Sequence, residues 1–247
     1  MTPHISPAII TRIREFGESD LMVSYLTADR GLLKGVAKGA RRSRRRFPNC
    51  LELFCLSDME YEQKKRGDLV FLHSCRLVDA FPGLRSDYHS LALASYMAEL
   101  TEVLFPPGVV DKRIFELLKN SLHALDEGFR GDILRILFEG RALALAGYSI
   151  DLDCCCQCGR RYAGEGRAVF NRVKGGIGCL KCEEERVDSP GLAPESINAL
   201  RIIQSSSWDQ LKNLELTEEA IREITPVIRL HMEYRVGRPL KTAKFLP

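Results

Sequence analysis

The sequence lacks the short motifs by which many nucleotide-dependent enzymes and hydrolases are recognised. None of the patterns G-x-x-x-x-G-K-[ST], G-x-S-x-G, H-E-x-x-H and G-x-G-x-x-G occurs in its 247 residues. The five histidines, at positions 4, 73, 89, 123 and 231, are scattered along the chain and are interpreted as structural residues. We therefore predict that the protein is not an enzyme.

Long apolar runs are also missing. No stretch approaches the roughly 18 apolar residues that a membrane-spanning helix needs. Residues 1–8 have neither the charged flank nor the apolar run of a secretory signal. We expect a cytoplasmic protein without membrane contact. In such a reducing compartment, clustered cysteines indicate metal ligands or redox groups rather than disulfides.

The charges are unevenly distributed, although the net charge is only +3. Residues 1–79 carry 14 Lys and Arg against 10 Asp and Glu, whereas the remaining 168 residues carry 22 against 23. A basic first third favours an anionic partner, and nucleic acid is the first candidate.

Two kinds of periodicity divide the chain. Residues 8–79 form five short β-rich segments separated by turn residues, which indicates a small closed barrel. From about residue 86 the apolar residues recur at helical spacing, and Pro226 is expected to kink or split the last helix. The predicted fold class is α+β, with a barrel domain over residues 1–79 and a helical domain over residues 80–247. A cysteine-rich insertion interrupts the helical domain at about residues 150–189.

Six of the nine cysteines lie within this insertion. Cys155 and Cys158 form one C-x-x-C pair, Cys179 and Cys182 form another, and 20 residues separate the pairs. Two thiolates on one tight turn can both reach an ion at about 2.3 Å, and two such turns complete a tetrahedral zinc site. Because four sulfur ligands leave no open position for water or substrate, we expect one structural zinc ion per chain. It would replace a core that an insertion of roughly 35 residues cannot build.

Alternatives to this ligand set remain open. Cys154 and Cys158 form a possible C-x-x-x-C pair, and Cys156 also lies nearby, although Cys155 is preferred as the first ligand. A single redox pair would not explain the second C-x-x-C. The other three cysteines fall on predicted strands and are interpreted as small core residues: Cys50, Cys55 and Cys75.

A basic stretch, RGLLKGVAKGARRSRRR, occupies residues 30–46 and holds eight Lys or Arg and no acidic residue. A solvated surface loop is the alternative interpretation. Since the two lysines continue the strand pattern, the cations are expected to run from a barrel face into a loop, which suits a phosphate track. No base-reading pattern is present, so binding without strong sequence preference is expected. The predicted DNA-binding residues are Lys34, Lys38, Arg41, Arg42, Arg44, Arg45 and Arg46.

Several motifs, in order along the chain, resemble the bacterial RecO recombination mediators. They are GLLKGVAKGARRSRRRF, LELF, FPGLRSDY, CQCG, GGIGCLKC and YRVGRPLKTAKFL, between about Ile9 and Leu246. The resemblance implies an N-terminal OB-fold and a C-terminal helical domain that carries a zinc insertion. It also implies a role in recombinational DNA repair at the nucleoid. That role comprises binding single- and double-stranded DNA, annealing complementary strands, and helping to load RecA onto strands coated by single-strand-binding protein.

The resemblance further implies two protein partners, RecR and the acidic, apolar C-terminal tail of single-strand-binding protein. Cations near the end of the chain, beside Leu230, Val236 and Leu240, are candidates for holding that tail. A solvated helix end with cations favourable to its dipole is the alternative. The candidate tail-binding residues are Arg229, Arg235, Arg238 and Lys241.

Two other classes of function compete with this one. A zinc-ribbon regulator that binds nucleic acid would need a base-reading helix, and the sequence offers no helix-turn-helix. A zinc-dependent nuclease or deaminase needs an open metal position and a catalytic Glu, which the four-cysteine set disfavours.

Overall fold

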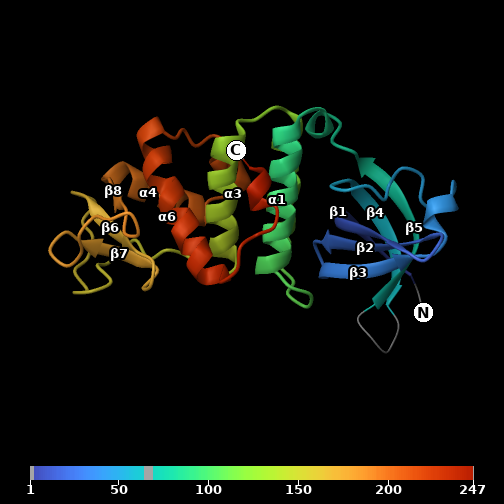
Figure 1. Cartoon of the computed structure of the whole chain (residues 1–247), viewed down its shortest axis with the longest axis horizontal. Coiled ribbons are helices and arrows are strands. Elements are labelled where there is room, and N and C mark those ends of the chain that lie inside the picture. The colour runs from blue at the N-terminus through green and yellow to red at the C-terminus, as the bar shows by residue number, and fades with distance from the viewer. Residues whose placement is uncertain (1–2, 64–68, 247) are drawn as a thin grey trace. The chain divides into compact units, whose positions relative to one another are not determined.

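The N-terminal strands form a closed five-stranded barrel of the OB type (Figure 1). The computed structural model describes residues 3–63 and 69–246. The strand order is β1-β2-β3-β5-β4, in which β3 and β5 are parallel and the other neighbours are antiparallel. The strands are β1 His4–Phe16, β2 Asp20–Thr27, β3 Gly31–Ala37, β4 Leu56–Gln63 and β5 Leu69–Asp79. The barrel predicted from five short β-rich segments is therefore confirmed.

The inward-facing residues fill the barrel. Its core holds Ile10, Val23, Met59, Val70 and Leu72, each at most 3% exposed. Because successive side chains of a strand point to opposite faces, the residues between them are left on the outer surface. Lys34, for example, is exposed between the partly and fully buried residues of β3.

The segment before β4 differs from the prediction. Residues 51–55 were expected to begin a strand, but they form a turn in which Phe54 has a positive φ of 67°. Its ring is buried, and its N–H donates to the carbonyl of Ile10 at 2.8 Å. The backbone here follows the burial of an aromatic ring rather than the β-propensity of the residues.

Two helices and the end of the chain complete the first compact unit, which comprises Met1–Phe129 and Lys241–Pro247. The helices are α1 Tyr88–Leu104 and α2 Lys112–Asp126, and they pack against each other. Each is capped by an aspartate: the carboxylate of Asp87 accepts from the N–H of Ser90, and that of Asp111 from the N–H of Arg113. In α1, Glu99 accepts from the backbone N–H groups of Lys241 and Thr242 at 3.0 and 2.8 Å, which fixes the C-terminal segment to this unit.

The second compact unit, Arg130–Leu240, is helical with an inserted ribbon. Its helices are α3 Gly131–Leu145, α4 Pro194–Ser205, α5 Trp208–Leu211 and α6 Glu218–Val236, of which α3, α4 and α6 pack together. A Cβ on Gly140 of α3 would lie 2.6 Å from Cγ2 of Ile203 in α4, so the glycine allows these two helices to approach closely. Helix α6 continues through Pro226 without a break.

Between α3 and α4 the chain leaves the helices and forms a small sheet in the order β7-β6-β8. Its strands are β6 Ala168–Asn171, β7 Gly176–Cys179 and β8 Gly191–Leu192. Helices after the barrel, and a cysteine-bearing insertion between two of them, are thus present as the predicted fold class requires. Among the described residues, no helix combines the length and the apolar character needed to cross a membrane.

Candidate nucleic-acid interface and metal centre

The basic segment leaves β3 and closes over the barrel as an anchored loop. Its first anchor lies at Gly39, whose φ of 65° turns the chain and whose N–H donates to Oδ1 of Asp20 at 2.8 Å. Arg41 N–H donates to the carbonyl of Ser19 at 3.1 Å. The short 3-10 helix η1 Ala40–Arg42 follows, with the Ala40 side chain packed into the barrel core.

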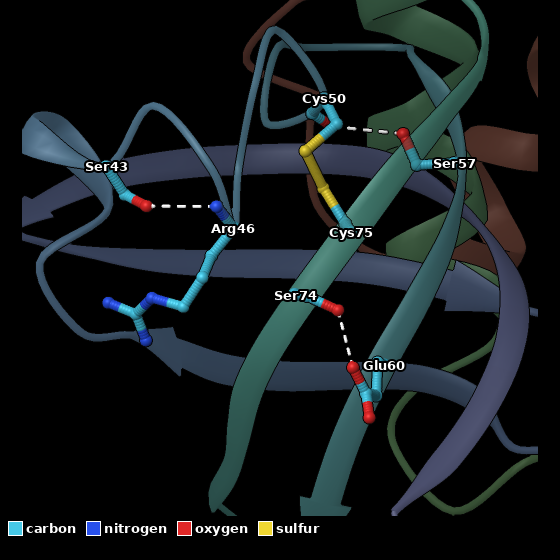
Figure 2. The surroundings of a disulfide bond; sticks show 7 residues. All are labelled: Ser43, Arg46, Cys50, Ser57, Glu60, Ser74 and Cys75. Carbon is cyan, nitrogen blue, oxygen red and sulfur yellow. Dashed lines mark hydrogen bonds between the residues drawn. A yellow bond between two sulfur atoms is a disulfide. The ribbon is translucent and has the colours of Figure 1, made fainter.

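The second anchor contains a disulfide bond between Cys50 and Cys75 (Figure 2). Both cysteines are buried, and Phe47 packs into the same core cluster. Two hydrogen bonds reinforce the bridge: Cys75 N–H donates to the carbonyl of Arg46 at 2.9 Å, and Ser57 Oγ to the carbonyl of Cys50 at 3.1 Å. Cys50 and Cys75 are core residues, as predicted, but the bond between them was not predicted; it is possible because the fold brings their Cα atoms to 6.2 Å. Cys55 is also a core residue, as predicted, but it precedes β4 and its thiol is free.

All seven predicted DNA-binding cations are exposed. Three of them have partners within the barrel. Lys38 Nζ lies 5.7 Å from the centre of the Phe71 ring, Arg41 pairs with Glu15 at 3.1 Å, and Arg46 donates to the carbonyl of Lys38 at 2.6 Å. Within residues 3–63 and 69–246, the side chains of the other four form no ion pair or hydrogen bond: Lys34, Arg42, Arg44 and Arg45. These four are the cations most available to an anionic ligand.

A shallow groove of about 160 Å³ continues this surface over the outer face of β1, β2 and β3. It contains Lys34 and two arginines of β1, Arg12 and Arg14, which are not among the cations predicted from the sequence. Their alternation on either side of the half-buried Ile13 was the available signal, since residues two apart in a strand share a face. The density of arginines along the sequence indicates only the loop, because there the arginines are adjacent.

In the second unit, the cluster of Cys155, Cys158, Cys179 and Cys182 has the geometry of a metal site. Their sulfur atoms all lie within 4.8 Å of one another. Two turns position them: Gly159 N–H donates to the carbonyl of Cys155 at 2.9 Å, and Cys182 N–H to that of Cys179 at 2.9 Å. Four thiolates at these separations match the tetrahedral preference of zinc, so the cluster can hold a metal ion.

Cys154 and Cys156 are absent from the cluster found among the described residues. The backbone of Cys154 forms an isolated antiparallel β-bridge with that of Arg161. The N–H of Cys156 donates to the carbonyl of Ile177 at 2.8 Å. Of the three consecutive cysteines, the structure therefore places Cys155 beside the other three members of the cluster.

Backbone N–H groups favour the thiolate form at two of the four cysteines, Cys155 and Cys179, whereas hydrogen bonds with the thiols of Cys179 and Cys158 raise the pKa of Cys182 to about 12. Burial alone would raise the pKa of Cys155, but hydrogen bonds from nearby N–H groups outweigh it and lower that pKa to about 6. One of these bonds runs from Cys179 N–H to Cys155 Sγ at 3.3 Å. Because metal ligands bind as thiolates, this environment suits cation binding.

A charge cluster fastens the ribbon to the helices. Arg167, beside β6, pairs with Glu185 of the ribbon at 2.9 Å and with Glu223 of α6 at 2.7 Å. Glu223 also accepts from Ala193 N–H at 2.7 Å and from Ser196 Oγ at 2.6 Å. Because the guanidinium of Arg167 pairs with carboxylates of both the ribbon and α6, this side chain holds the ribbon against the helix.

The four cations predicted to hold the tail of single-strand-binding protein lie in different compact units. Arg229 and Arg238 are exposed in the second unit, whereas Lys241 belongs to the first. Arg235 is only partly exposed, and its Nε is buried. A Cβ on Gly175 would lie 2.1 Å from Arg235 Nη2, so this arginine packs directly on the ribbon.

Comparison with known proteins covers nearly the whole chain. Residues 1–81 match the family model "Recombination protein O N terminal", and residues 85–244 match "Recombination protein O C terminal". The DNA repair protein RecO of Syntrophus aciditrophicus (strain SB) is 31% identical over 98% of this chain and 95% of its own length. The protein of the same name from Anaeromyxobacter sp. (strain K) is 35% identical over 96% and 93%, and that of Desulfatibacillum aliphaticivorans 34% over 100% and 97%. The chain belongs to the RecO family.

Proposed function

We propose that this protein is a recombination mediator of DNA repair that binds and anneals DNA strands without catalysing a covalent reaction. One observation carries the proposal. A loop fastened to the barrel at both ends presents Arg42, Arg44 and Arg45 to solvent with no intramolecular acid to neutralise them, within the described residues. The names of the relatives, DNA repair protein RecO, support the same conclusion, and they disfavour a zinc-ribbon regulator.

The loop suits phosphates rather than bases. Its guanidinium groups can each donate two parallel hydrogen bonds to a phosphate, and such contacts carry no sequence information. Two complementary strands repel each other through their backbones. A protein surface that neutralises several phosphates lowers this repulsion, so strands can meet and pair while bound. Nothing in this process requires nucleotide hydrolysis.

We assign the cysteine cluster to one structural zinc ion per chain. The ion would be held by the four clustered thiolates and would join the two turns of the ribbon. A four-sulfur site leaves no position for a substrate, so the metal stabilises the fold of the insertion rather than acting on DNA. The thiolate-favouring backbone at Cys155 supports this assignment.

Protein partners follow from the family and from the charges. We propose that the chain acts with RecR and helps to load RecA. We also propose that the helical unit holds the acidic tail of single-strand-binding protein. Exposed Arg229 and Arg238, with the partly exposed Arg235, supply positive charge near the buried Leu230 and Leu240; Lys241, the fourth candidate, belongs to the first unit and stays a separate candidate. Charge complementarity with such cations speeds the encounter with an acidic peptide and fixes its orientation.

An annealing assay tests the proposal. Two unrelated pairs of complementary oligonucleotides are mixed with the full-length protein in the absence of nucleotide, and duplex formation is followed by fluorescence quenching. The proposal predicts faster annealing of both pairs to a similar extent. It would be wrong if the protein left the spontaneous rates unchanged or if it acted on only one sequence.

A further inference from the structure

The groove on the outer barrel face has an ordered row of polar side chains. In the strand register, Arg12 of β1 lies opposite Ser24 of β2, and Ser24 lies opposite Lys34 of β3. Arg14 lies two residues farther along β1, opposite Met22. The groove therefore has cations on β1 and β3, on either side of Ser24 in β2, and its lining includes the apolar side chains of Met22 and Leu33.

One acidic side chain interrupts this row. Glu102, in the last turn of α1, also lines the groove, and its Oε2 lies 2.7 Å from Nη2 of Arg12. Its Oε1 accepts from Thr11 Oγ1, also at 2.7 Å. The Glu102 side chain is only 15% exposed, so its charge is held against Arg12 rather than dispersed in water. By contrast, Arg14 and Lys34 form no ion pair with any residue that the structure describes.

We propose that the Glu102 carboxylate occupies the position of a DNA phosphate at Arg12 and thereby weakens the groove's grip on a single strand. The inference rests on the proposed DNA-binding function and specifies how affinity is limited at the same barrel surface. Carboxylates and phosphates compete for the same guanidinium geometry, so a strand lying across the groove must displace Glu102 or leave Arg12 unused. The negative charge also opposes any phosphate that approaches Arg14.

The groove and the basic loop of residues 38–46, called the arginine loop below, together form one cationic surface. Lys34 and Lys38 are four residues apart and are both exposed, and Lys38 begins the loop. A strand that contacts the loop cations can therefore continue onto Lys34 and toward Arg12. Limiting affinity at the far end suits a mediator that must release DNA after pairing. Tighter binding there would slow dissociation, because differences in affinity appear mainly in the off-rate.

A purely structural role for Glu102 makes a different prediction. The carboxylate also ties α1 to β1, so its loss could simply weaken the first unit. Glu102→Gln separates the two roles because the amide oxygen can still accept from Thr11 while the negative charge is removed. Glu116→Gln on α2 is the matched control. It removes the same charge from the same unit, at a carboxylate that faces Lys119 at 2.5 Å rather than the groove.

The test measures binding of a fluorescent oligothymidylate to the full-length protein over a range of salt concentrations. We expect Glu102→Gln to steepen the log-log salt dependence by about 0.7, the value of one added phosphate contact on a single strand. Taken from a reference of 1 M salt, this corresponds to about fivefold tighter binding at 0.1 M. Adding Arg12→Ala to Glu102→Gln should abolish the gain, and Glu116→Gln should retain the wild-type slope.

Each other outcome has a definite meaning. A Glu102→Gln protein that melts at lower temperature but keeps the wild-type slope would overturn the inference and leave Glu102 as a structural tie. An equal gain in both glutamine variants would also overturn it, because the effect would then be one of net charge. If the wild-type protein showed no salt-dependent DNA binding, the proposed function itself would fail and this inference with it.

Discussion

The arginine loop gives the sharpest quantitative prediction. Replacing Arg42, Arg44 and Arg45 together by Ala removes three exposed cations that have no partner among the described residues. Arg46 is deliberately retained, because its guanidinium donates to the carbonyl of Lys38 and lies 5.2 Å from the Phe47 ring, so it supports the loop itself. The substitution should therefore change charge without releasing either anchor of the loop.

The expected magnitude follows from counterion release. Each phosphate contact on a single strand contributes about −0.7 to the log-log slope of affinity against salt. If the four unpaired cations of residues 30–46 all bind, they contribute about −2.8 to the wild-type slope, and the triple variant should be shallower by about 2. Taken from a reference of 1 M salt, the affinity loss is about 100-fold at 0.1 M and about tenfold at 0.3 M. Exposed charges contribute little to folding, so the unfolding free energy should change by less than about 0.5 kcal/mol.

Fluorescence anisotropy with two unrelated single strands provides the assay, and both strands should weaken equally. The matched control replaces Arg222, Arg229 and Arg238 by Ala. These are exposed arginines of the second unit that form no ion pair within the described residues, so the change in net charge is the same. A loop variant with the wild-type slope would refute the assignment, as would a control variant that lost as much affinity.

Three further predictions concern stability. Cys158→Ser should give a protein without stoichiometric zinc and with a protease-sensitive ribbon, because metal binding supplies the folding free energy of the insertion; elemental analysis that found no zinc in wild-type protein purified without chelator would contradict this. Reducing the Cys50–Cys75 bridge with a dithiol should lower the unfolding free energy by about 3.5 kcal/mol in urea titrations, as expected for a closed segment of 25 residues. Rapid alkylation of both cysteines in unreduced, unfolded protein would show that the bridge does not form. Burial, with the nearby charge of Arg235, lowers the pKa of His231, so the unfolded chain binds its proton more readily and stability should fall as the pH drops below about 6.5. His231→Gln, which can still donate to the Tyr148 carbonyl, should make unfolding less sensitive to pH in this range; an unchanged pH dependence would argue against the assignment.

Local patterns in the sequence predict much of this fold. Short β-rich segments between turn residues mark the barrel strands, and helical spacing marks α2 from Ile114 to Leu125. The two C-x-x-C pairs predict the cysteine cluster because their spacing encodes the turns directly. In each case the relevant residues are close in sequence, so local geometry determines their relation.

Features that depend on distant residues could not be predicted in this way. The Cys50–Cys75 bridge depends on how the loop returns to β5, and the cytoplasmic expectation argued against a disulfide. The contact between Arg12 and Glu102 joins residues separated by 90 positions. Only the packing of α1 on the barrel creates it. The same limitation explains why Arg12 and Arg14 escaped attention while the adjacent arginines of the loop did not.

Photo-crosslinking tests the central claim most directly. A single strand with photoreactive thymidine analogues is bound to the full-length wild-type protein, irradiated and digested, and the modified peptides are identified by mass spectrometry. We predict crosslinks in residues 30–46 and in the strand that contains Arg12 and Arg14. Crosslinks confined to the cysteine-bearing part of the ribbon, residues 154–182, would contradict the account, because DNA would then lie on the surface that the zinc ion supports rather than on the barrel.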